Sequence, residues 1–132
     1  MIEVVTAVIK NNEKILLLKR GYKVRTYKGK WACISGYLEK NEKPLERAIK
    51  EIEEETGLKS KEIKFIKSIP PIEFYDKEEK IKWKVYPFLF ETANNKIKID
   101  WEHVEYKWVE INEIEKYDTV PKLKEVIYKL MK

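Results

Sequence analysis

The stretch "GYLEKNEKPLERAIKEIEEETGL", residues 36–58, places an acidic helix in a chain whose formal net charge is +5. Pro44 suits the first turn of a helix, because that turn leaves its N–H groups without partners in any case. Gly57 suits the end, since glycine readily adopts the left-handed conformation that closes many helices. The stretch therefore predicts a helix from Pro44 to Thr56.

One face of this predicted helix is apolar and the neighbouring face is acidic. The apolar stripe has the spacing of a core-facing helix face and consists of Leu45, Ala48, Ile49 and Ile52. Glu51, Glu54 and Glu55 follow at i, i+3 and i+4, which brings like charges within reach of one another. A divalent cation would offset their repulsion, and oxygen ligands favour Mg²⁺ or Mn²⁺ over Zn²⁺. The alternative is that all three side chains simply face water, as on many glutamate-rich helices.

Strand-like runs surround the helix on both sides. The predicted strands are "IEVVTAVIK" (2–10) and "KILLLKR" (14–20), joined as a hairpin by the turn "NNE", followed by "EIKFIKSI" (62–69), "KIKWKVYPFLFE" (80–91) and "KIKIDWEHVEYKWVEI" (96–111), the last around a loop near 101–103. "WACISGYLE" (31–39) is predicted to be a short strand that runs into a loop. "PPIEFYDKEE" (70–79) is expected to be a loop, and a terminal helix is expected after Pro121. Strands outnumber helices, so we expect helices packed on a mixed sheet in the α/β or α+β class.

Length and composition favour one globular domain over residues 1–132, because no repeat or linker divides the chain. The apolar runs are too short to cross a bilayer, and the first residues show no secretory signal. The single Cys33 cannot form an internal disulfide. We therefore expect a cytoplasmic protein without a membrane partner.

Written with its spacing, the stretch is Gly36, five residues, Glu42, seven residues, and then "KEIEEETGL" from position 50. It closely resembles the Nudix box, Gly-x5-Glu-x7-Arg-Glu-U-x-Glu-Glu-x-Gly-U, where U is a bulky aliphatic residue. Every fixed position matches except Lys50, where the family has arginine. The resemblance implies a Nudix-type α/β/α sandwich with a mixed β-sheet between helices.

The resemblance also implies hydrolysis of a pyrophosphate linkage in a nucleoside diphosphate derivative, with Mg²⁺ (or Mn²⁺) as cofactor. Glu51 is then a candidate general base, and Glu42 would brace the loop against the helix together with position 50. Lys50, a catalytic candidate, keeps the charge of the family arginine but lacks its planar fork. The implied metal-binding groups are the Gly36 carbonyl and the carboxylates of Glu51, Glu54 and Glu55.

Glu102, in "WEH", is a separate candidate. Nudix enzymes with a similar Glu-His-x-x-Tyr-x-Trp segment place that glutamate near the metals, as an extra ligand or as the base. The alternative is a loop glutamate in water. We interpret His103 as a loop or core histidine, and Tyr106 and Trp108 as strand packing.

Substrate identity is less sharply indicated. Arg25, Lys28 and Lys30 precede the box and either contact phosphates or are surface charges. Tyr75 lies about as far downstream as the tyrosine of dinucleoside polyphosphate hydrolases, and its ring suits stacking on a base. The leading substrate is a (d)NTP or oxidised nucleotide, chosen on breadth within the family. Alternatives are a dinucleoside polyphosphate or ADP-ribose hydrolase.

A Nudix module that binds a nucleotide or RNA without cleaving it is a further alternative. The intact box glutamates favour an enzyme, because loss of catalysis in this family usually accompanies loss of those glutamates. An RNA partner is the less favoured case and stays open, as does a homodimer formed through an exposed strand edge.

Overall fold

The computed structural model describes residues 1–132 and contains two α-helices and eight strands. The strands are β1 (Ile2–Asn11), β2 (Lys14–Arg20), β3 (Trp31–Ala32), β4 (Ile34–Tyr37), β5 (Ile63–Ser68), β6 (Ile72–Asp76), β7 (Ile81–Thr92) and β8 (His103–Glu110). The helices are α1 (Pro44–Thr56) and α2 (Leu123–Leu130), with 3-10 helices η1 (Ser60–Glu62) and η2 (Ile111–Lys116). None of the helices has both the length and the apolar character that crossing a membrane requires.

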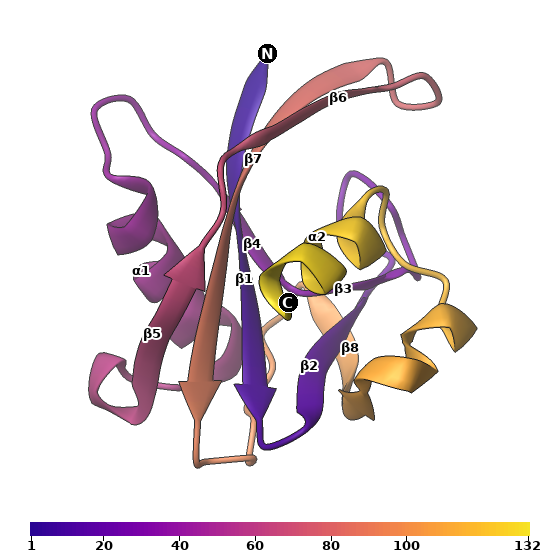
Figure 1. Ribbon diagram of the computed structural model, residues 1–132. Helices are drawn as coiled ribbons and strands as arrows, with labels where there is room; N and C mark the ends of the chain where they lie inside the picture. The colour runs from indigo at the N-terminus through magenta and orange to yellow at the C-terminus, as the bar shows by residue number, and fades with distance from the viewer.

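The sheet is mixed, and β1 lies near its centre (Figure 1). β1 pairs in parallel with β7 and antiparallel with β2 and β4. The path continues from β2 to β3 and from β7 to β5, while β8 pairs with β2 and β6 with β7. The predicted mixed sheet is confirmed.

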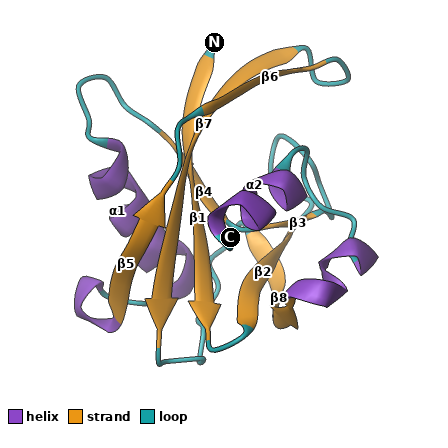
Figure 2. Cartoon of the chain, in the orientation of Figure 1, coloured by secondary structure: helices purple, strands orange, loops and turns teal.

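Alternation along β1 builds two hydrophobic cores, one on each face of the sheet. Val8 joins a cluster with Val126 and Ile127 of α2, whereas Ala7 and Ile9 join a cluster that contains Ile52 of α1. Successive side chains of a strand point to opposite faces, so β1 contributes to both cores. Figure 2 shows α1 and α2 apart, with β1 and β7 between them. This arrangement confirms the expected α/β/α sandwich.

The predicted helix boundaries of α1 are confirmed. Pro44 occupies the first turn, and Gly57 adopts φ 78°, with its N–H donating to the Glu53 carbonyl at 2.9 Å. Ala48 and Ile52 are fully buried, so the apolar stripe faces the core as expected. The hairpin of β1 and β2 and the terminal helix α2 are confirmed as well.

The expected loop at 70–79 is wrong, because it contains β6. Ile72 lies opposite Val85 and Phe74 opposite Trp83, so β6 pairs antiparallel with β7 and the two strands form a hairpin (Figure 1). The alternation in "IEFYD" was the available signal, and the adjacent prolines concealed it. Both prolines precede the strand, where no ladder N–H is needed.

Two other strand predictions need correction. The run at 31–39 is divided at Cys33 into β3, which pairs with β2, and β4, which pairs with β1. The expected strand character at 96–100 is wrong, since this segment is irregular and the Lys98 N–H donates to the Thr56 carbonyl at 3.0 Å. Ile97 and Ile99 pack against the core on the α1 side, which accounts for their alternation.

Candidate active site

Three of the carboxylates singled out in the sequence, Glu51, Glu54 and Glu102, line a cleft of about 560 Å³, whereas Glu55 lies outside its lining. Gly36 of β4, Glu51 and Glu54 of α1, and Glu102 of the loop before β8 all line it. The fold therefore brings together residues from three separate segments of the chain.

Gly36 allows Glu51 to pack directly on the backbone of β4. A Cβ added at Gly36 would lie 2.2 Å from the Cδ of Glu51 and 2.5 Å from its Oε2. These distances are far below ordinary contact, so a side chain at position 36 would displace the carboxylate. The glycine of the box is thus required for close approach of the helix side chain.

Of the box glutamates, the three proposed as metal ligands, Glu51, Glu54 and Glu55, differ in burial. Glu51 is 9% exposed and Glu55 only 2%, whereas Glu54 faces solvent. The alternative in which all three face water is therefore wrong. Burial raises the pKa of Glu51, and burial together with the neighbouring Glu51 carboxylate raises the pKa of Glu55 well above its usual value.

This donor set suits a hard divalent cation. The Oε2 of Glu55 is buried without a hydrogen-bond partner, and a carboxylate oxygen in that state is costly unless a cation or proton joins it. As the side chains lie, no three His, Cys, Asp or Glu residues form a ready-made metal site. A cation would therefore require at least one of the carboxylates to turn toward it.

His103 is buried at the start of β8, in line with its interpretation as a core histidine. It also faces the carboxylate cluster, which the sequence did not indicate. Its Nδ1 lies 2.8 Å from Oδ1 of Asp100, and its Nε2 lies 3.8 Å from Oε1 of Glu55. The imidazole thus lies between the carboxylates of Asp100 and Glu55.

Glu42 and Lys50 lie beside the cluster and outside the lining of the cleft. Glu42 is joined to α1 mainly by Arg47, which binds it through two nitrogens at 2.8 and 2.7 Å. The Lys50 side chain is 62% exposed, and its Nζ approaches Oε2 of Glu42 only to 3.8 Å.

The basic side chains at the cleft are only partly those expected. Arg25 lines it, together with Arg20 and Lys23, which the sequence did not single out. Arg20 ends β2 immediately before the loop, and that position was the available signal. Of the other candidates, Lys30 pairs with Asp118 at 3.3 Å, and Lys28 and Tyr75 lie outside the lining.

Aromatic residues of the loop at 21–30 and of the β6–β7 hairpin form another wall of the cleft. The Tyr27 hydroxyl donates to Asp76 and accepts a hydrogen bond from Nε1 of Trp83 at 3.1 Å. Phe74 and Trp101 also line the cleft, and Trp101 is 70% exposed. The site therefore offers carboxylates, basic groups and aromatic rings to one ligand.

Comparison with solved structures shows that the whole fold recurs. An Ap4A hydrolase from C. elegans matches with a TM-score of 0.82 at 18% identity, over 99% of this chain and 96% of that one. The dihydroneopterin triphosphate pyrophosphohydrolase of E. coli gives 0.82 at 18% identity, over 96% and 92%. A MutT protein from Methanosarcina mazei Go1 gives 0.77 at 28% identity, over 98% and 92%.

The sequence itself matches the model of the NUDIX domain over residues 2–130. This match covers nearly the whole chain, including the box from Gly36 to Leu58 and the segment around Glu102. Members of this family generally use divalent metal ions. The chain therefore belongs to the NUDIX domain family and is a Nudix hydrolase.

Proposed function

We propose that this protein hydrolyses a pyrophosphate linkage in a (d)NTP or an oxidised nucleotide, with Mg²⁺ or Mn²⁺ as cofactor. The observation that carries the proposal is the composition of one cleft. Glu51 and Glu54 line it together with Arg20, Arg25 and several aromatic rings. A nucleotide needs these three kinds of contact for its cation, its phosphates and its base.

In this proposal the cation is held by the Gly36 carbonyl and by the carboxylates of Glu51, Glu54 and Glu55. When bound, such an ion neutralises phosphate charge and makes a water molecule more acidic. The guanidinium group of Arg25 is suited to phosphate oxygens, because its planar fork binds two oxygens at once. Arg20 donates through Nε to the Thr26 carbonyl at 3.0 Å and through Nη2 to the Thr26 hydroxyl at 3.4 Å, which leaves its Nη1 for a phosphate. The Tyr27, Phe74 and Trp83 wall is suited to the base.

Glu51 and Glu102 are the two candidates for the carboxylate that accepts a proton from the attacking water. Burial raises the pKa of Glu51, and burial together with nearby Asp100 raises the pKa of Glu102. A raised pKa brings a carboxylate closer to neutral pH, where it accepts a proton more readily. Both groups line the cleft, so both are within the substrate's reach.

A dinucleoside polyphosphate is the second candidate substrate. The C. elegans structural neighbour is an Ap4A hydrolase, which favours this candidate. Trp101 adds a mostly exposed ring at the edge of the cleft, where a second base would find a stacking partner. This substrate class needs no change in the proposed chemistry.

The test is a nucleotide panel with and without Mg²⁺ or Mn²⁺, with products identified by chromatography. The panel contains triphosphates, oxidised dGTP, dinucleoside polyphosphates, ADP-ribose and capped RNA. Glu54→Gln removes a proposed ligand, and Glu53→Gln is its matched control, because Glu53 is exposed on the same helix and outside the cleft.

Metal-dependent cleavage of a triphosphate by wild type and Glu53→Gln, lost in Glu54→Gln, would support the proposal. Preferential cleavage of a dinucleoside polyphosphate would support the second candidate instead. Metal-linked nucleotide binding without turnover of any member would contradict hydrolysis and indicate a binding module.

A further inference from the structure

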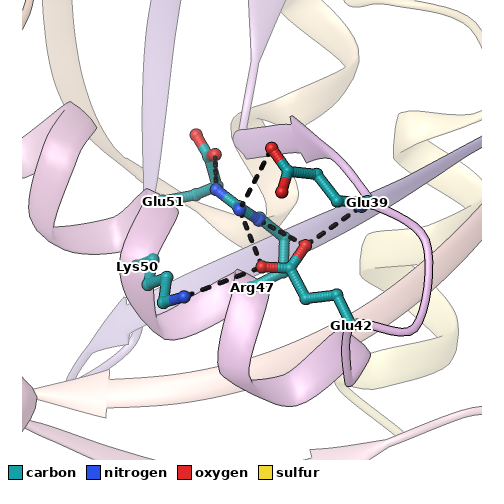
Figure 3. Close-up of polar contacts among 5 residues, drawn as sticks. All are labelled: Glu39, Glu42, Arg47, Lys50 and Glu51. Carbon is teal, nitrogen blue, oxygen red and sulfur yellow. Dashed lines mark hydrogen bonds and ion pairs between the residues drawn. The ribbon is translucent and has the colours of Figure 1, made fainter.

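Arg47 connects Glu42, in the loop before α1, with the Glu51 carboxylate on α1. Its Nε donates to Oε1 of Glu42 at 2.8 Å, and its Nη2 lies 2.7 Å from Oε2 of the same carboxylate. Its Nη1 donates to Oε2 of Glu51 at 3.0 Å. Figure 3 shows the guanidinium between the two glutamates, with Glu39 at its outer edge.

This cluster is largely shielded from water. The side chain of Arg47 is 13% exposed, and those of Glu42 and Glu51 are each 11% exposed. Glu42 accepts a further hydrogen bond from the Glu39 N–H at 3.0 Å, and these contacts lower its pKa to about 2. Shielded, charge-assisted bonds with two-pronged geometry fix the direction of a side chain, not only its charge.

Lys50 lies one turn further along α1 and approaches the same carboxylate from solvent. Its Nζ is 3.8 Å from Oε2 of Glu42, and no contact joins it to Glu51 (Figure 3). An ammonium group is a point charge on a flexible stem and does not fix orientation. Only Arg47 bridges the loop and the cluster.

We propose that Arg47 is the positioning residue of this site: its guanidinium fork, anchored on Glu42, aims the Glu51 carboxylate at the cleft. The inference rests on the proposed function for the identity of the ligand, a divalent cation. The anchor on Glu42 matters because it fixes the guanidinium from the side away from the cleft. Glu51 then receives one bond from Arg47 and is confined on another side by the Gly36 backbone.

The experiment compares wild type, Arg47→Ala, Arg47→Lys, Lys50→Ala and the double variant Arg47→Lys with Lys50→Arg. Binding of Mn²⁺ is measured by electron paramagnetic resonance of the free ion, and folding by urea unfolding. Crystal structures of wild type, Arg47→Lys and Lys50→Ala report the direction of Glu51 even when no metal is bound. Arg47→Lys keeps the charge, so it tests the fork if Arg47→Ala does not fold.

We expect Arg47→Ala and Arg47→Lys to weaken Mn²⁺ binding by about 10- to 100-fold, the usual effect of removing a partner behind a metal ligand. Lys50→Ala should weaken it by less than about threefold, because its contact is long and exposed. The double variant should recover little of the loss, because position 50 reaches Glu42 but has no contact with Glu51.

Unchanged Mn²⁺ binding in Arg47→Lys, or an equal loss in Lys50→Ala, would overturn the inference. If wild type binds no Mn²⁺, the metal proposal fails and the crystal structures decide the positioning role alone. A Glu51 side chain that keeps its direction in Arg47→Lys would then overturn it, and a turned or disordered one would support it.

Discussion

The contact between Gly36 and Glu51 gives a prediction whose size follows from a distance. In Gly36→Ala the new Cβ would lie 2.2 Å from the Cδ of Glu51. Ordinary contact begins at 3.4 Å, so the carboxyl carbon must retreat by about 1.2 Å, the difference between the two distances. This retreat would disturb the bond from Arg47, which holds the same carboxylate at 3.0 Å.

A displacement of this size should affect binding more than folding. Misplacing a functional group by about 1 Å can cost about 100-fold in activity, and we expect that order of loss for turnover in Gly36→Ala. Overpacking of a tight contact typically costs about 1–3 kcal/mol of folding free energy. The pairing of β4 with β1 through Gly36 and Val5 uses backbone groups and should persist.

The assay measures Mn²⁺ affinity, turnover of the best nucleotide and urea unfolding for Gly36→Ala and for the double variant with Glu51→Asp. Aspartate is shorter by one methylene, so the double variant should recover folding free energy without recovering Mn²⁺ affinity. Gly36→Ala with affinity and turnover within about twofold of wild type would refute the steric reasoning. So would a double variant less stable than Gly36→Ala alone.

Three further predictions concern stability and the walls of the cleft. Because the pKa of Glu55 is raised in the folded chain, its contribution to stability is greatest below the unfolded value of 4.5 and falls as pH rises through the folded pKa. In EDTA, Glu55→Gln should therefore be more stable than wild type by about 1–3 kcal/mol at pH 8 and by less at pH 5. Equal gains in urea unfolding at the two pH values would contradict this. Asp76→Asn should weaken the bond from Tyr27 and speed amide hydrogen exchange at residues 21–30, and unchanged exchange would show that the bond does not order the loop. Ile52→Ala should cost about 2–5 kcal/mol in urea unfolding, because Ile52 is fully buried under the sheet, and a loss below about 1 kcal/mol would contradict that packing.

Much of the fold was predictable because local signals agreed with tertiary packing. Pro44, Gly57 and the apolar stripe fixed α1, and alternation in the strands fixed both faces of the sheet. The errors arose where one signal has two causes. Ile97 and Ile99 have the alternating pattern of a strand, yet they lie in an irregular segment at the end of α1. The pattern arises because both side chains pack against the core on the α1 side.

The candidate site was predictable in composition but not in its contacts. Spacing along α1 put Glu51 and Glu55 near each other, but spacing alone cannot tell a buried carboxylate from a solvated one. Burial depends on how the loop after β4 folds α1 back onto Gly36, and on His103, which lies far from α1 in the sequence. The role of Arg47 likewise depends on a contact that the sequence does not show, because the loop before α1 folds so that Glu42 accepts a hydrogen bond from Arg47.

Glu51 and Glu55 make the unligated protein less stable than its hydrophobic cores would allow. Each buried carboxylate is contacted by one basic side chain, Arg47 for Glu51 and His103 for Glu55, while Oε2 of Glu55 has no partner. Burial of two neighbouring carboxylates raises the pKa of both and costs folding free energy. A cation that bound only the folded chain would offset this cost, and at 100 times its Kd it would add about 2.7 kcal/mol. The same side chains that reduce stability without a ligand are therefore those through which a ligand would most strongly stabilise the fold.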